Sequence, residues 1–242
     1  APPTLGSVSR IPNERFAGLA WSPWWRLYQP ELLDDVIFDG DGVLLRLAVG
    51  GPGGSLWFDD DDGFAAGVEV EGDFDVCADV QVYNLAGDDV PAGGTARVAG
   101  LGVHSPIRPP FPGWPFRLYV FRMFGREPGR TAGDAAPVDA YKINRATEGS
   151  PPPFSVSTYD TLEHPSPGTA RGWIRLARVG STVSSWRAGP GPEPALAAWS
   201  GRVDYEAPEL PTRVLVGPMI YSSAADADIS ARIRAFINTP GT

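Results

Sequence analysis

Hydrophobic and polar residues alternate with a period of two along much of this 242-residue chain. The clearest stretch is residues 68–83, VEVEGDFDVCADVQVY, in which valines and other apolar residues alternate with acidic and polar ones. A period of two predicts a β-strand with one buried face and one solvated face. Gly72 interrupts the run, and we expect a bend or a bulge at this glycine.

Residues 172–186, GWIRLARVGSTVSSW, carry the strongest hairpin signal. A two-residue turn that begins at Gly180 joins two runs rich in β-forming residues. The turn sets the register of the two strands and places Arg175 opposite Trp186. Directly opposed side chains lie within contact distance, so we expect a cation–π contact between this pair.

Short strands separated by loops rich in proline and glycine are predicted along the rest of the chain. Residues 224–237 are the one stretch that tempts a helical interpretation, but the alternation from Ile229 to Ile237 predicts a terminal strand instead. The total is about twelve to fourteen strands, with no helix and no repeat of a propeller or solenoid. The further strands are predicted within residues 34–49 on either side of a D-G-D-G turn, and at 56–58, 98–103, 116–124, 138–144, 154–159, 199–205 and 213–221.

The composition agrees with an all-β protein. The chain contains 29 glycines, 26 prolines and eight tryptophans, and 43% of its residues are hydrophobic. Short strands between many turns produce such a mixture, and this many tryptophans exclude a disordered chain. We predict one domain at residues 16–242 and an extended arm at residues 1–15, which is the candidate contact for a homo-oligomer.

Three stretches resemble one known family. The strand WIRLARVG with its returning Trp186, the segment G-D-F-D-V at residues 72–76, and the pair RVLVGPMIYSS and ISARIRAFIN within residues 213–238 are similar to strands of concanavalin A-like lectin/glucanase sandwiches. The laminin-G-like and DUF1349-like branches are the most similar. The resemblance implies a jelly-roll sandwich of two antiparallel sheets with long Pro/Gly-rich loops. It implies no single activity, because the fold hosts binders, structural modules and hydrolases.

Charge and cysteine content exclude several classes of partner. The net charge of −9 argues against a nucleic-acid surface, which needs clustered lysine and arginine. No apolar run approaches the roughly 18 residues of a membrane span. Cys77 is the only cysteine, so an intrachain disulfide is excluded and no thiolate metal cluster can form.

The sequence offers one arrangement for glycoside hydrolysis, which needs two carboxylates across a cleft. If residues 68–83 form one strand, its acids project from one face. In the glucanase branch of the family that the chain resembles, the catalytic acids follow the pattern E-x-D-x-x-E. This sequence departs from it, with a valine in place of the second glutamate. His104 and His164 match no catalytic motif, and we interpret them as surface residues. The candidate acids of an enzyme are Glu69, Glu71, Asp73 and Asp75.

Clustered carboxylates also indicate a possible calcium site, since Ca²⁺ prefers oxygen ligands. Acidic residues flank the D-G-D-G turn and form a run of four at residues 59–62. The resemblance to laminin-G-like sandwiches, which often hold Ca²⁺ at a loop rim, points the same way. No other cofactor is implied. The candidate ligands are Asp39, Asp41, Asp59 and Asp61.

We interpret the chain as a non-enzymatic binding module at an exterior surface, either extracellular or on a cell or virion, with a glycan as its ligand. Trp24, Trp25 and Trp114 are the candidate contacts, because tryptophan faces cover the apolar face of a pyranose and these three lie in Pro-flanked stretches. Two other interpretations stay open. The chain could be a structural accessory or decoration subunit of a virion or another surface assembly, with another protein as its partner, or it could be a glycoside hydrolase or polysaccharide lyase.

Overall fold

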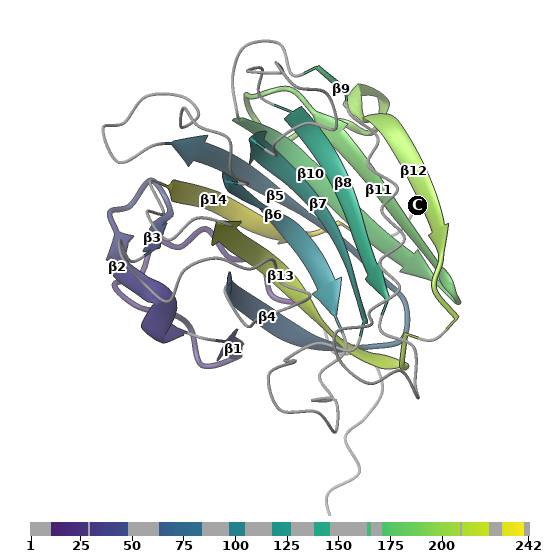
Figure 1. Ribbon diagram of the computed structural model, residues 1–242, viewed down its shortest axis with the longest axis horizontal. Helices are drawn as coiled ribbons and strands as arrows, with labels where there is room; N and C mark the ends of the chain where they lie inside the picture. The colour runs from purple at the N-terminus through teal and green to yellow at the C-terminus, as the bar shows by residue number, and fades with distance from the viewer. Residues whose placement is uncertain are drawn as a thin grey trace, which may run out of the picture.

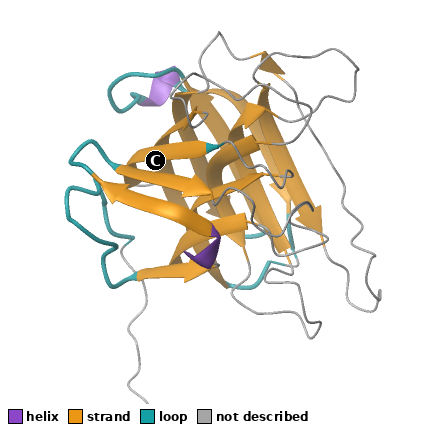
Figure 2. Ribbon diagram, turned by 60° about the vertical axis from the view of Figure 1, so that its left-hand side comes forward, coloured by secondary structure: helices purple, strands orange, loops and turns teal. Residues whose placement is uncertain are grey.

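Two antiparallel sheets pack face to face in the computed structural model (Figure 1 and Figure 2). The model describes residues 11–28, 30–47, 63–83, 97–104, 118–126, 138–145, 164–165, 171–208, 210–222 and 229–239. The prediction of an all-β sandwich is confirmed. Within these residues, the helical segments are two single 3₁₀ turns, η1 (Pro30–Leu32) and η2 (Leu196–Ala198), and no helix has the length and apolar character to cross a membrane.

Within the described residues, each sheet has seven strands. We call the sheet with the order β12-β11-β10-β5-β14-β3-β2 the front sheet, and the sheet with the order β1-β4-β13-β6-β7-β8-β9 the back sheet. The front sheet contains β2 (Leu33–Phe38), β3 (Val43–Leu47), β5 (Phe74–Tyr83), β10 (Arg171–Val179), β11 (Thr182–Ala188), β12 (Ser200–Glu206) and β14 (Ser230–Asn238). The back sheet contains β1 (Trp25–Tyr28), β4 (Gly63–Glu71), β6 (Arg97–His104), β7 (Leu118–Arg126), β8 (Val138–Arg145), β9 (His164–Pro165) and β13 (Arg213–Ser222).

Alternate residues of the strands form the main core between the sheets. In β5 the inward set is completely buried at Val76, Ala78 and Val80, and Val214 and Val216 of β13 face it from the back sheet. Each fully buried valine of this core contributes about 1.5–3 kcal/mol to folding through loss of apolar surface from water. The two-residue period of the sequence therefore gives each central strand its inner face.

A cluster of aromatic side chains from the N-terminal segment and β14 packs at one end of the core. Trp25 lies 5.8 Å from Phe16, 5.4 Å from Trp21 and 5.2 Å from Phe236, measured between ring centroids. Only 6% of Trp25 is exposed, so this ring cannot stack on a ligand and the prediction that Trp25 is a surface contact is wrong. The Trp-rich stretch serves packing at this position.

Part of the predicted N-terminal arm lies along the same chain. Glu14 and Phe236 exchange two backbone hydrogen bonds of 2.8 Å, and the Asn238 amide donates to the Asn13 side chain. Ile11 is buried as well. Residues 1–10 fall outside the described residues. The described part of the arm thus contacts its own domain, and the domain boundary and an oligomer formed through the arm stay predictions.

The run at residues 68–83 is two strands in different sheets, which corrects the prediction of a single strand. Gly72 has a positive φ of 86° and accommodates the tight connection between β4 and β5. β4 pairs with β13 in the back sheet, whereas β5 pairs with β10 and β14 in the front sheet. The alternation continues across the connection because both strands turn their apolar sides toward the same core.

The late hairpin and the terminal strand are both confirmed. Arg175 pairs with Trp186 in the β10–β11 register, and Gly180 has the positive φ that its turn requires. In β14, however, a bulge between Ile233 and Ala235 shifts the alternation. Because of this bulge, Phe236 enters the main core, while Ala235 packs in a small cluster on the outer side of the front sheet.

Gly217 marks a close approach inside the back sheet. A Cβ atom at this position would collide with the Ala66 carbonyl and meet the Trp25 ring at 3.0 Å. We therefore expect Gly217→Ala to lower the free energy of unfolding by at least about 2 kcal/mol in urea denaturation. The control Gly189→Ala adds its methyl group to open space and should change stability by less than about 0.5 kcal/mol. Equal stability of the two variants would contradict the packing described here.

Candidate functional site

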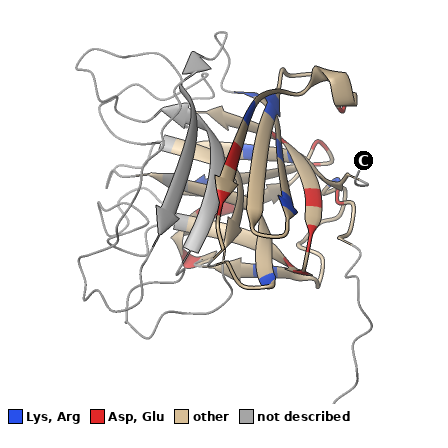
Figure 3. Cartoon of the chain, turned by 90° about the vertical axis from the view of Figure 1, so that its right-hand side faces the viewer, with Lys and Arg blue, Asp and Glu red and all other residues tan. Residues whose placement is uncertain are grey.

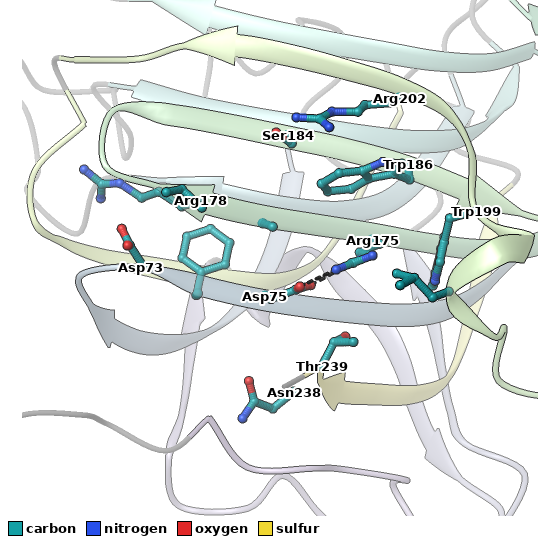
Figure 4. Close-up of a pocket in the computed structure, with 14 residues that line it drawn as sticks. Asp73, Asp75, Arg175, Arg178, Ser184, Trp186, Trp199, Arg202, Asn238 and Thr239 are labelled. Atoms are coloured by element: carbon teal, nitrogen blue, oxygen red, sulfur yellow. Dashed lines mark hydrogen bonds and ion pairs between the residues drawn. The ribbon is translucent and has the colours of Figure 1, made fainter. Parts of the chain in front are cut away.

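A pocket of about 690 Å³ lies on the outer face of the front sheet (Figure 4). Strands β5, β10, β11 and β12 lie side by side there, and the connection that contains η2 borders one end. Arginines and acids are interspersed over these neighbouring strands (Figure 3). The polar and aromatic residues that line the pocket are Asp73, Phe74, Asp75, Arg175, Arg178, Ser184, Trp186, Trp199, Arg202, Asn238 and Thr239.

A buried ion pair between β5 and β10 forms the floor of the pocket. The Arg175 Nε donates to Asp75 Oδ1 at 2.8 Å, and its Nη2 donates to Oδ2, so the pair is bidentate. Only 7% of the Arg175 side chain and 11% of the Asp75 side chain are exposed. The hydrogen bonds that Arg175 donates to the Asp75 carboxylate raise the pKa of Arg175 above its usual value.

Arginine and tryptophan side chains alternate across the strands next to this pair. The Arg175 guanidinium lies 4.8 Å from the Trp186 ring centroid, which confirms the predicted cation–π contact. The Arg202 guanidinium lies 5.4 Å from the same ring, and the two arginines come from β10 and β12, the strands that flank β11. Arg175 also lies 6.0 Å from the Trp199 ring. We call the row Arg202–Trp186–Arg175–Trp199 the Arg–Trp row (Figure 4).

The end of the pocket near Trp199 is fixed by a small outer cluster. Trp199 packs against the buried residues Cys77, Trp173, Ala188, Ala235 and Ile237. The Trp173 Nε1 donates to the Gly191 carbonyl at 3.0 Å and so ties the connection before η2 to the sheet. The Trp199 ring therefore has a defined position although it lies beyond a long connection.

The opposite end of the pocket is held by Arg178. Its guanidinium donates to the backbone carbonyls of Gly180, Leu210 and Pro211 at 2.8, 3.0 and 2.6 Å. Burial lowers the pKa of Arg178 from its usual value. Asp73 accepts a hydrogen bond of 2.8 Å from the Gly180 amide. These bonds fix the β10–β11 turn, so Arg178 supports the pocket, and each of its three guanidinium nitrogens already donates to a backbone carbonyl.

The four candidate acids of an enzyme do not share one face, and that prediction is wrong. Glu69 and Glu71 belong to β4 in the back sheet, where Arg213 of β13 lies 3.3 and 4.0 Å from their carboxylates. Asp73 and Asp75 lie at the pocket of the front sheet. The cause is the crossing between sheets at Gly72. Both oxygens of Asp75 also accept from Arg175.

Two of the candidate calcium ligands lie in a charge network with arginines. Arg232 lies 2.7 Å from an oxygen of Asp39, and the Arg234 Nε lies 3.1 Å from Asp41 Oδ2. The hydrogen bond from Arg232 lowers the pKa of Asp39. The carboxylates of Asp39 and Asp41 therefore form ion pairs with arginine side chains. Among the described residues, no group of three or more His, Cys, Asp or Glu side chains is arranged to hold a metal ion. Asp59 and Asp61 fall outside the described residues.

The other sequence-based candidates are distributed over the molecule. Trp24 is 45% exposed and lies directly before β1, away from the residues that line the pocket. Trp114 falls outside the described residues. His104 is only 1% exposed, with its ring edge-on to Tyr28 at 5.3 Å, so its interpretation as a surface residue is wrong. None of the four residues of the Arg–Trp row is a sequence-based site candidate, although the sequence pairs Arg175 with Trp186. Arg202 approaches Trp186 because β12 pairs with β11, and Trp199, directly before β12, approaches Arg175.

The arrangement of strands is shared with solved structures of lectins and glycoside hydrolases. A functionally unknown protein from Saccharomyces cerevisiae superposes with a TM-score of 0.58 at 14% identity, covering 90% of this chain and 98% of its own. A seed lectin of Lotus tetragonolobus superposes with a TM-score of 0.55 at 10% identity, and the match covers 94% of this chain and 97% of the lectin. A glycoside hydrolase family protein from Mycobacterium thermorestibile superposes with a TM-score of 0.52 at 13% identity, and the match covers 93% of this chain and 98% of that protein.

The chain has the concanavalin A-like fold. The predicted superfamily resemblance is therefore confirmed at the level of the fold. No protein-family model matches the sequence, and no curated protein matches it either. At identities of this size the concanavalin A-like neighbours establish architecture alone, and function has to be argued from the pocket.

The buried ion pair predicts a large stability effect. Asp75→Asn removes the carboxylate and leaves the Arg175 guanidinium buried, so we expect the free energy of unfolding to fall by about 3–5 kcal/mol. The matched control is Asp35→Asn, since Asp35 forms an ion pair with Arg46 in which both side chains are about 40% exposed. The control should change stability by less than about 1 kcal/mol. Urea denaturation measures both, and a small effect at Asp75 would refute the structural role of the pair.

The Cys77 thiol beneath Trp199 should be unreactive in the folded protein. The thiol is 1% exposed, and burial raises its pKa to about 11. At about pH 8 we expect labelling by a thiol reagent to be at least about a hundredfold slower in the folded protein than in urea, because the thiolate is the reactive form. A spectroscopic thiol assay with and without urea gives the two rates. Similar rates in both conditions would show that the outer cluster does not seal Cys77.

Proposed function

We propose that this chain is a glycan-binding module and that the pocket on the front sheet is its binding site. The observation that carries the proposal is the presence of two half-buried indole rings, Trp186 and Trp199, beside polar side chains in one pocket. Indole surfaces pack against the apolar faces of sugar rings, and polar groups placed around them bind the hydroxyls. An extracellular or cell-surface location fits this role.

The groups that would bind sugar hydroxyls are held in place by the fold. Ser184 and Arg202 both bond to Asp204, at 2.6 and 2.8 Å, and therefore project from β11 and β12 in fixed positions. Asn238 lies at the end of β14, with its backbone amide bonded to Asn13. Side chains ordered in this way lose little freedom when a ligand binds, which favours affinity.

Binding is supported over hydrolysis by the state of the pocket carboxylates. A hydrolase needs one carboxylic acid and one carboxylate on opposite sides of the scissile bond. Among the described lining residues the carboxylates are Asp73 and Asp75, and Asp75 is fully engaged by Arg175. A pair with one member held in this way does not match the requirement. If the protein released reducing sugar from a bound polysaccharide above background, this result would favour the hydrolase interpretation instead.

The tryptophans of the pocket provide the direct test. We expect Trp199→Ala and Trp186→Ala to weaken binding by at least about tenfold, because each removes an aromatic surface from the site. The probe is the oligosaccharide that gives the strongest signal on a glycan array, and isothermal titration calorimetry measures its Kd. Circular dichroism and thermal melting establish that each variant is folded.

Trp24→Ala is the matched control, because Trp24 is an exposed tryptophan outside the pocket and was a candidate contact from the sequence. We expect its Kd to equal that of the parent protein. Loss of binding in Trp24→Ala alone would place the glycan site near β1 instead. Absence of binding to every glycan on the array, together with a stable oligomer in light scattering, would favour the assembly-subunit interpretation.

A further inference from the structure

We propose that the sugar recognised by the pocket is acidic, a hexuronate whose carboxylate is bound by the free guanidinium nitrogens of Arg202 and Arg175. This inference rests on the proposed glycan-binding function and specifies its ligand class. Three observations carry it: the unused donors of Arg202, the unused donor of Arg175, and the prior engagement of the acids beside them.

Arg202 presents two N–H-bearing nitrogens that have no acceptor within the described part of the chain. Its Nε donates to Asp204 Oδ1 at 2.8 Å, which fixes the plane of the guanidinium against Trp186. The side chain is 60% exposed, so its Nη1 and Nη2 atoms remain accessible. The planar edge of a guanidinium matches the two oxygens of a carboxylate, and such charge-assisted pairs are about twice as strong as neutral hydrogen bonds.

Arg175 supplies a further donor from the floor of the pocket. The side chain is 7% exposed, with its Nε and Nη2 committed to Asp75. Its Nη1 has no acceptor among the described residues, although Arg175 lines the pocket (Figure 4). An arginine that is held in place by a bidentate carboxylate, with its remaining nitrogen uncommitted beside an open pocket, is a built position for an anionic oxygen.

The acids nearest to these arginines would not repel the ligand as free carboxylates would. Asp75 accepts from Arg175, and Asp204 accepts from Arg202 and Ser184. These bonds from Arg202 and Ser184 lower the pKa of Asp204 and keep it ionised within its pair. The chain as a whole carries a net charge of −9, so binding of an acidic polymer requires this local arrangement.

The test compares polygalacturonate with the same polymer after reduction of its carboxylates to alcohols. We expect the acidic form to bind at least about tenfold more tightly, and Arg202→Gln to remove most of that preference. Arg213→Gln is the matched control, because Arg213 is a similarly exposed, ion-paired arginine on the back sheet and its substitution changes the net charge equally. Binding should also weaken as NaCl rises from about 20 to about 300 mM.

The outcomes separate this inference from the proposed function. Selective binding of the acidic polymer that is lost in Arg202→Gln and kept in Arg213→Gln supports the hexuronate assignment. Equal binding of the acidic and reduced polymers, or binding only of neutral glycans on an array, overturns the assignment and leaves the glycan-binding function intact. If Arg202→Gln and Arg213→Gln weakened binding of the acidic polymer equally, the effect would be one of net charge, and the hexuronate assignment would also be overturned. If the protein binds no glycan at all, both the hexuronate assignment and the proposed glycan-binding function are overturned.

Discussion

The ion pair between Asp75 and Arg175 is the constraint on which the front-sheet pocket depends. A guanidinium that is more than nine-tenths buried needs its carboxylate, because an unpaired charge in this position costs several kcal/mol. Once paired, Arg175 has a fixed place between Trp186 and Trp199, and Arg202 completes the row on the far side of Trp186. The same contacts that stabilise three neighbouring strands therefore shape the floor of the site.

The sequence predicts local features of this site and misses the non-local ones. The turn at Gly180 determines which residues of β10 and β11 oppose each other, so the contact between Arg175 and Trp186 could be derived before the structure. Trp199 and Arg202 join the row through the pairing of β12 with β11, and no local pattern specifies that pairing. The sequence does not distinguish a tryptophan that packs in the core from one that contacts a ligand, and the burial of Trp25 shows that this residue packs in the core.

Periodicity also failed where it was strongest, at residues 68–83. The alternation predicts correctly which side chains enter the main core, but it does not predict the burial of Cys77 and Asp79 on the other face of β5. It also does not distinguish one long strand from two strands in opposite sheets that share a core. The positive φ of Gly72 makes that difference. In β14 a bulge changes the register after Ile233, and this too is decided by packing against β5. Predictions of fold class tolerate such errors, whereas a prediction of paired catalytic acids does not.

The concanavalin A-like fold is shared by lectins and glycoside hydrolases, so chemistry at the pocket has to decide between them. The carboxylate at the floor is held by an arginine, whereas indole rings and guanidinium nitrogens face the pocket. The most direct measurement is a ¹⁵N–¹H spectrum that follows the indole N–H signals of the eight tryptophans during titration with an acidic oligosaccharide. The account predicts saturable shifts at Trp186 and Trp199 and none at Trp24. Shifts at Trp24 with unchanged pocket signals would contradict it.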